Sequence, residues 1–190
     1  MTTVKRYEIL EALPVYGPMY IPVTESGEPF YSEGFAVRFF KTDGTEWVAN
    51  FQPGWTELRK VLEFEGTSKL LVIANGACYL MLPDETRPLS VFGVGYSDLI
   101  KADKQRLVLQ DQTDLTIIEA NGEHWHTERI SWDGLKDLKI ENNMVTGLSY
   151  DPMYDADEWV IFSYDLNNKI LTGGSYNRHT TVKKPWWKVW

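Results

Sequence analysis

The chain contains a single cysteine, Cys78, among its 190 residues. One thiol cannot form an internal disulfide, and it excludes any zinc site built from several cysteines. Cys78 lies within an apolar run from Ala77 to Met81. Such a run favours a small buried side chain over the electropositive, partly open setting that a reactive thiolate requires.

Long apolar runs and basic patches are also missing. No stretch approaches the roughly 18 apolar residues of a membrane-spanning helix, and residues 1–14 lack the apolar core of a signal peptide. We therefore expect no membrane span and a cytoplasmic location. The formal net charge is −8, whereas nucleic-acid binding depends on positive charge against phosphates. We expect no nucleic-acid partner, and the acidity instead suits a basic protein partner.

The common signatures of catalysis are absent too. The sequence has no Gly-x-Ser-x-Gly elbow, no Gly-x-Gly-x-x-Gly loop and no Walker loop. The short Gly93-Val94-Gly95 segment does not make a phosphate cradle. These absences leave enzymatic activity uncertain and favour a protein that is not an enzyme.

What the sequence does have is aromatic residues and turn signals. Aromatic side chains make up 14% of the chain, and such residues pack well on pleated sheets. Apolar runs alternate with Asp-Gly and Asn-Gly pairs at Asp43, Asn75 and Asn121, which favour tight hairpin turns. The pattern predicts an all-β fold of antiparallel hairpins. The best candidate for a helix is the segment Trp55–Phe64, where Leu and Val recur at helical spacing.

The turns also recur at a regular distance. Asn75, Asn121 and Asn167 are about 46 residues apart, which is a spacing expected of structural repeats. A further turn at Asn142-Asn143 falls midway through the last interval, so each repeat holds about four strands. The spacing predicts a small propeller-like arrangement of about four blade units. A β-sandwich or a curved meander is the alternative.

The chain reads as a single domain, residues 1–190. We expect an irregular, Pro/Gly-rich lead-in over residues 1–34, because prolines at that density do not suit central strands. A β-rich body follows over residues 35–176. A basic aromatic tail then occupies residues 177–190.

The stretch from Leu70 to Tyr176 resembles β-propeller repeats in general. The runs Glu128–Gly134, Gly147–Pro152 and Gly173–Tyr176 also resemble stretches in bacterial proteins of unknown activity. This resemblance implies a propeller-like fold. It assigns no catalytic residue to the chain.

One pattern points to metal binding. His124 and His126 are two residues apart, so on a strand both side chains point to the same face, and Glu128 has the same parity. Two imidazoles with a carboxylate can ligate a divalent metal such as zinc. Without such a metal, the same residues form a solvated or hydrogen-bonded strand face, and the chain then needs no cofactor.

Tryptophans supply candidate contact surfaces. Trp125 and Trp132 are expected either in the core or lining a ligand site, since exposed aromatic rings offer flat contact surfaces. In the tail, Trp186, Trp187 and Trp190 lie within eight residues of three lysines. Such a segment suits a protein partner, a membrane interface or docking on the chain itself.

These observations favour an intracellular binding or interaction module that recognises a basic protein partner. One alternative is an enzyme, either metal-dependent through His124 and His126 or acid-based through the carboxylates of residues 151–158. The other alternative is a small-molecule or sugar binder.

Overall fold

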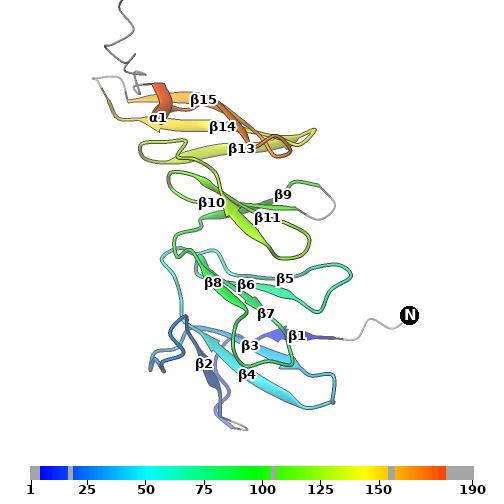
Figure 1. Ribbon diagram of the computed structural model, residues 1–190. Helices are drawn as coiled ribbons and strands as arrows, with labels where there is room; N and C mark the ends of the chain where they lie inside the picture. The colour runs from blue at the N-terminus through cyan, green and yellow to red at the C-terminus, as the bar shows by residue number, and fades with distance from the viewer. Residues whose placement is uncertain (1–4, 17–18, 104–105, 154–156, 179–190) are drawn as a thin grey trace, which may run out of the picture. The chain divides into compact units, whose positions relative to one another are not determined.

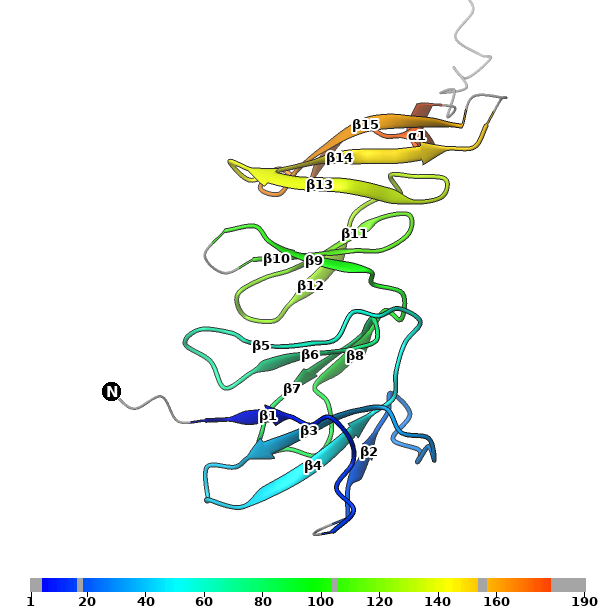
Figure 2. The same cartoon turned by 180° about the vertical axis from the view of Figure 1, so that it is seen from behind.

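The computed structural model describes residues 5–16, 19–103, 106–153 and 157–178. They form four four-stranded sheets, drawn in Figures 1 and 2, together with one short helix, α1 (Ser175–Arg178). The expected all-β class and the expected number of blade-like units are confirmed. In the described part of the chain, no helix is long and apolar enough to cross a membrane.

Contacts within the chain group its residues into two compact units. The first unit comprises Met1–Leu99 and Ile118–His124, and the second comprises Ile100–Ile117 and Trp125–Trp190.

The first sheet has the strand order β1-β3-β4-β2. Its strands are β1 (Tyr7–Ile9), β2 (Ile21–Val23), β3 (Phe35–Phe40) and β4 (Glu46–Phe51). The strands β1 and β2 come from the segment 1–34, which we expected to be irregular. The Pro22 at the centre of β2 is tolerated because β2 is an edge strand, paired in parallel with β4.

The second sheet is an antiparallel meander, β5-β6-β7-β8. It contains β5 (Lys60–Glu63), β6 (Leu70–Ala74), β7 (Ala77–Met81) and β8 (Ser90–Phe92). Every residue of β6 and β7 is buried, which explains why both read as unbroken apolar runs rather than alternating ones. With the apolar face of the first sheet, these strands form one core, which includes Phe39, Phe51 and Met81.

The third and fourth sheets follow along the chain. The third has the order β12-β11-β10-β9 and the fourth the order β13-β14-β15-β16. Their strands are β9 (Asp98–Lys101), β10 (Leu107–Gln110), β11 (Leu115–Ile118), β12 (His124–His126), β13 (Leu135–Glu141), β14 (Met144–Asp151), β15 (Glu158–Asp165) and β16 (Ile170–Gly173). A second core gathers around Ile117, Val145 and Phe162.

The asparagine turns are real, but they are not all equivalent. Asn75 and Gly76 both have positive φ, as a two-residue type I′ hairpin requires. Asn75 joins the two inner strands of its sheet, whereas Asn121 and Asn167 each join an inner strand to an edge strand. The spacing of about 46 residues therefore separates equivalent turns only for Asn121 and Asn167. Asn75 lies at the same spacing but in a different turn of its sheet, so its position in the series is a coincidence of loop lengths.

The predicted helix over Trp55–Phe64 is wrong. Residues 52–59 form no regular element, and Lys60–Glu63 is strand β5, paired antiparallel with β6. Tertiary pairing overrides the helical spacing because β6 offers a buried edge of backbone donors and acceptors that a neighbouring strand must satisfy.

Candidate functional site

A pocket of about 430 Å³ lies in the first unit, at the ends of β4 and β8 and the start of β7. We call it the aromatic pocket. Most of its lining is apolar, with a carboxylate and an amide beside it. The lining residues are Glu25, Gln52, Pro53, Trp55, Ala77, Tyr79, Val91, Phe92, Gly93 and Val94. A mostly apolar hollow with a few polar groups is the usual form of a ligand site.

The backbone that carries Trp55 is held firmly although it has no regular structure. The amide of Gly54 donates to the carbonyl of Ala74 at 2.9 Å, and that of Trp55 donates to the carbonyl of Val94 at 2.8 Å. A Cβ atom at Gly54 would lie 2.3 Å from the same Val94 oxygen, so this close approach requires glycine. Trp55 therefore projects from an anchored segment.

The Trp55 side chain itself is 84% exposed. Tryptophan is among the residues most enriched at binding hot spots, so an exposed indole on an anchored backbone is a candidate contact residue. Glu25 is exposed as well and lines the same pocket. An aromatic face and a carboxylate thus border one hollow.

Tyr79 lies deeper in the pocket and is 2% exposed. Its hydroxyl donates to the carbonyl oxygen of Gln52 at 2.8 Å. Burial, with a smaller contribution from the charge of Glu25, raises the pKa of Tyr79 to about 12. The hydroxyl therefore keeps its proton and holds the end of β4 against β7, which gives the pocket a rigid wall.

Phe92 connects this pocket with the His124–His126 segment that the sequence singled out. The rings of Phe92 and His124 are stacked, with centroids 3.7 Å apart and planes inclined by 15°. Phe92 also lines the aromatic pocket. His124 therefore supports a pocket residue through ring packing.

His126 has different surroundings. Its Nδ1 atom is 2.9 Å from the Thr116 hydroxyl and 3.7 Å from a carboxylate oxygen of Asp114. Burial raises the pKa of Asp114, and the charge of Asp111 adds to that, while His126 opposes it. His126 thus sits beside a half-buried carboxyl group.

The predicted metal ligands are not gathered into one site. Within the described residues, which include His124, His126 and Glu128, no three His, Cys, Asp or Glu side chains are placed to hold a metal ion. Metal binding at these residues stays a prediction for experiment. Residues 154–156 of the acidic loop lie outside the described residues, and the acid-based alternative is likewise untested.

Of the tryptophans predicted to form a contact surface, two pack against other side chains and three belong to the tail, outside the described residues. Trp125 is half-buried, 6.0 Å from the Tyr164 ring, with the Lys169 ammonium 4.1 Å from its ring centroid. Trp132 is half-buried beside Tyr176, with ring centroids 4.7 Å apart. A role for either tryptophan in ligand binding remains a prediction. Outside the described residues lie Trp186, Trp187 and Trp190.

The aromatic pocket was not found by sequence reasoning. Trp55 was interpreted as the start of a helix, so its exposure could not be foreseen. One signal was present in Pro53-Gly54-Trp55, because Pro followed by Gly marks an irregular turn rather than a helix interior. The other lining residues lie far apart in sequence and meet only through strand pairing.

Comparisons with known proteins assign no family. No family model matches the chain, and no curated protein matches it. Among solved structures, the chain is similar to the N-terminal domain of Nup159, at 13% sequence identity and a TM-score of 0.39. The match covers 88% of this chain and 49% of that one, so the chain spans about half of the similar structure. At this level of similarity, neither a shared family nor a shared function follows.

Proposed function

We propose that the chain is a binding module whose aromatic pocket accepts a cationic side chain of a basic protein partner. The observation that carries this proposal is the pairing of an 84% exposed Trp55 with Glu25 at one pocket. The indole face attracts cations through its quadrupole, and the carboxylate adds direct charge attraction.

The pocket suits a side chain rather than a flat surface. Its volume of about 430 Å³ falls within the usual range of small-ligand pockets, and its Tyr79 and Phe92 walls are largely buried. Anchoring of residues 54–56 to neighbouring backbone keeps Trp55 in place before binding, which lowers the entropy cost of association. A long Lys or Arg stem could lie along these apolar walls with its charge near Glu25.

The rest of the chain favours a protein as the source of that cation. The net charge of −8 gives long-range attraction toward a basic surface. Further large side chains on the first unit face solvent, including Met19 at 89% exposure. Exposed apolar residues of this kind supply contact area for a protein partner.

The test is isothermal titration of the full chain with a lysine- and arginine-rich peptide, at low and at high salt. Trp55→Ala and Glu25→Gln are each expected to weaken binding about tenfold. The matched controls are Tyr31→Ala, another exposed aromatic, and Glu28→Gln, another exposed acid, because neither lines the pocket. The controls should bind as the parent chain does.

Three outcomes would overturn the proposal. Absence of binding to the peptide is one, and affinity that ignores salt is another. The third is binding to a neutral oligosaccharide that depends on Trp55 but not on Glu25, which would favour the sugar-binder alternative. In that case, the exposed indole would stack on a sugar ring instead of a cation.

A further inference from the structure

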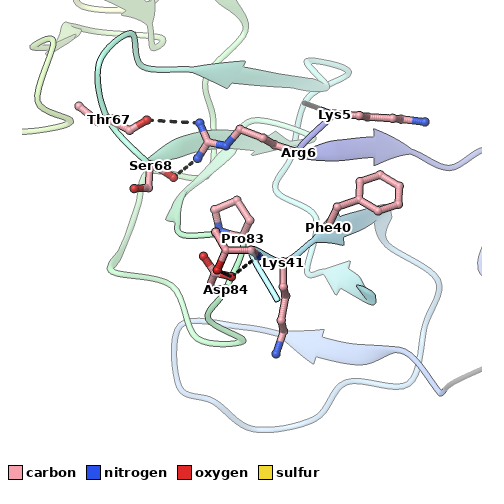
Figure 3. Close-up of a pocket in the computed structure, with 9 residues that line it drawn as sticks. Lys5, Arg6, Phe40, Lys41, Thr67, Ser68, Pro83 and Asp84 are labelled. Carbon is pink, nitrogen blue, oxygen red and sulfur yellow. Dashed lines mark hydrogen bonds between the residues drawn. The ribbon is translucent and has the colours of Figure 1, made fainter. Parts of the chain in front are cut away.

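A second pocket of about 390 Å³ lies at the opposite ends of β4 and β7 from the aromatic pocket (Figure 3). We call it the basic pocket. It is formed by the start of β1, the β3–β4 turn, the β5–β6 turn and the loop after β7. The lining residues are Lys5, Arg6, Phe40, Lys41, Thr42, Thr67, Ser68, Pro83 and Asp84.

The sign of its charge is opposite to that of the chain as a whole. Three of the lining residues are cationic, and within the described part of the chain Asp84 is the one acid in the lining. The Asp84 carboxylate is already held, accepting hydrogen bonds from the backbone amide and the hydroxyl of Thr42 at 2.8 and 3.0 Å. The lining residues thus carry a formal excess of positive charge on a protein of net charge −8, and two of the cations, Lys5 and Arg6, also pair with Glu8 and Glu63 outside the lining.

Arg6 is the fixed cation of this pocket. Its guanidinium donates to the backbone carbonyls of Thr67 and Ser68, as Figure 3 shows. Carbonyl groups orient the guanidinium but do not neutralise its charge. The nearest carboxylate, Glu63, is 3.4 Å away and 44% exposed, so water screens this ion pair.

The two lysines are adjustable by comparison. Among the described residues, Lys41 has no side-chain hydrogen bond or salt bridge, and its charge adds to the hydrogen bonds from Thr45 in lowering the pKa of the neighbouring Asp43. Lys5 pairs with Glu8 at 3.0 Å and lies 5.4 Å from the centroid of the Phe40 ring. In Figure 3, both lysine side chains extend away from Arg6 toward the surroundings of the pocket. Their flexible stems allow either ammonium to turn toward a bound anion.

The remaining walls are apolar and firmly placed. Phe40 and Pro83 face the pocket, and the Pro83 carbonyl accepts a hydrogen bond of 2.8 Å from the buried indole of Trp47. A ligand of the basic pocket would therefore meet an apolar surface beside positive charge. Inorganic phosphate alone would leave that apolar surface uncovered.

We propose that the basic pocket binds a small organic anion, a carboxylate or phosphate ester with an apolar ring or chain. Arg6 pairs with its charged group, the flexible Lys41 side chain turns toward that group on binding, and Phe40 and Pro83 pack against its apolar body. This site is separate from the aromatic pocket in both position and sign of charge. It stands whether or not the aromatic pocket binds a basic partner.

The test is isothermal titration with phenyl phosphate and benzoate, compared with inorganic phosphate and the neutral benzyl alcohol. Both organic anions are expected to bind more tightly than either comparison compound. Lys41→Glu should weaken phenyl phosphate binding about tenfold, since it places a like charge at the pocket. Phe40→Leu should weaken phenyl phosphate while leaving inorganic phosphate unchanged.

Two control variants make the test specific. Lys60→Glu makes the same charge reversal on an exposed residue of β5 outside the pocket lining, and should not change the affinity. Trp55→Ala should not change it either, which separates this proposal from the aromatic pocket. Equal loss in Lys41→Glu and Lys60→Glu, equal binding of benzyl alcohol, or no binding of either organic anion would overturn the proposal.

Discussion

The imidazole of His124 stacks on the ring of Phe92, with their centroids 3.7 Å apart. This contact ties His124 to a residue that lines the aromatic pocket, while His126 two positions later faces Thr116 and Asp114. Their spacing of two residues on one strand suits two ligands of one metal ion, but in this structure the two histidines have different neighbours. The difference can be tested directly.

The metal site predicted at His124, His126 and Glu128 can be tested with zinc. Because His124 and His126 have separate neighbours, we expect zinc to leave the melting midpoint of the protein unchanged. A ligand that binds the native state must raise the midpoint, so a thermal-shift assay with zinc, and with a chelator, measures this. A zinc-dependent rise that disappears in His124→Ala would support the predicted metal site and, with it, the enzyme alternative.

Asp114 should make stability depend on pH. Burial raises its pKa above the ordinary value of 3.8, so the folded state binds the proton more readily than the unfolded state does. This group therefore favours folding below pH 3.8 and disfavours folding once pH rises through the folded-state pKa. Asp114→Asn is expected to raise the free energy of unfolding at neutral pH but not in acid.

Urea unfolding of the parent and variant at neutral and acidic pH measures that difference. Glu141→Gln, on an exposed position of β13, serves as the control and should have no effect at either pH. If Asp114→Asn destabilises the protein at neutral pH, the ionised carboxylate is stabilising, and our interpretation of its burial is wrong.

Two tryptophans of the first unit should respond very differently to the same substitution. Trp47 is 6% exposed and its indole donates to the Pro83 carbonyl. Trp47→Phe should cost about 1–3 kcal/mol, because a buried carbonyl loses its donor. Trp55→Phe at the 84% exposed site should change stability by less than about 0.5 kcal/mol. Chemical unfolding of both variants measures these costs, and similar losses would contradict the assigned exposures.

The sequence predicted the fold class well because its signals are local. Turns at Asn75-Gly76 and Asn142-Asn143 depend on positive φ at adjacent residues, which asparagine and glycine adopt readily. The unbroken apolar runs of β6 and β7 are typical of buried strands. Neither signal depends on distant parts of the chain.

The candidate sites could not be predicted in the same way. The aromatic pocket joins Glu25, Trp55, Tyr79 and Phe92, which are brought together only by strand pairing and by backbone bonds of residues 54–56. Helical spacing over Trp55–Phe64 pointed to the wrong element, because local periodicity carries no information about the free edge of β6. Prediction therefore failed where long-range contacts decide the structure.

The Asn75 turn gives a test of the local signals. Asn75 has φ of 51°, and its side-chain oxygen accepts a hydrogen bond from Arg59 at 2.8 Å. Asn75→Ala should cost about 1–2 kcal/mol, because alanine in the left-handed region is strained. Asn75→Gly should cost less, since glycine adopts that φ freely although it loses the Arg59 contact. The unfolding midpoints of both variants measure these losses of stability. Equal losses in the two variants would mean that the hydrogen bond from Arg59, and not the positive φ, accounts for the contribution of Asn75.

In the second unit, the buried hydroxyl of Ser175 should contribute measurably to the free energy of unfolding. The Ser175 side chain is fully buried, donating to the Tyr150 carbonyl at 2.7 Å and accepting from the Trp132 amide at 3.2 Å. Ser175→Ala keeps the volume nearly unchanged but leaves both backbone groups without this partner, so we expect a loss of about 1–3 kcal/mol. Ser163→Ala is the matched control, because the half-buried Ser163 hydroxyl forms no hydrogen bond with any described residue. Chemical unfolding of the two variants should separate them clearly. Equal stability would mean that water replaces the Ser175 hydroxyl at no cost, and that α1 is not held to the fourth sheet through this contact.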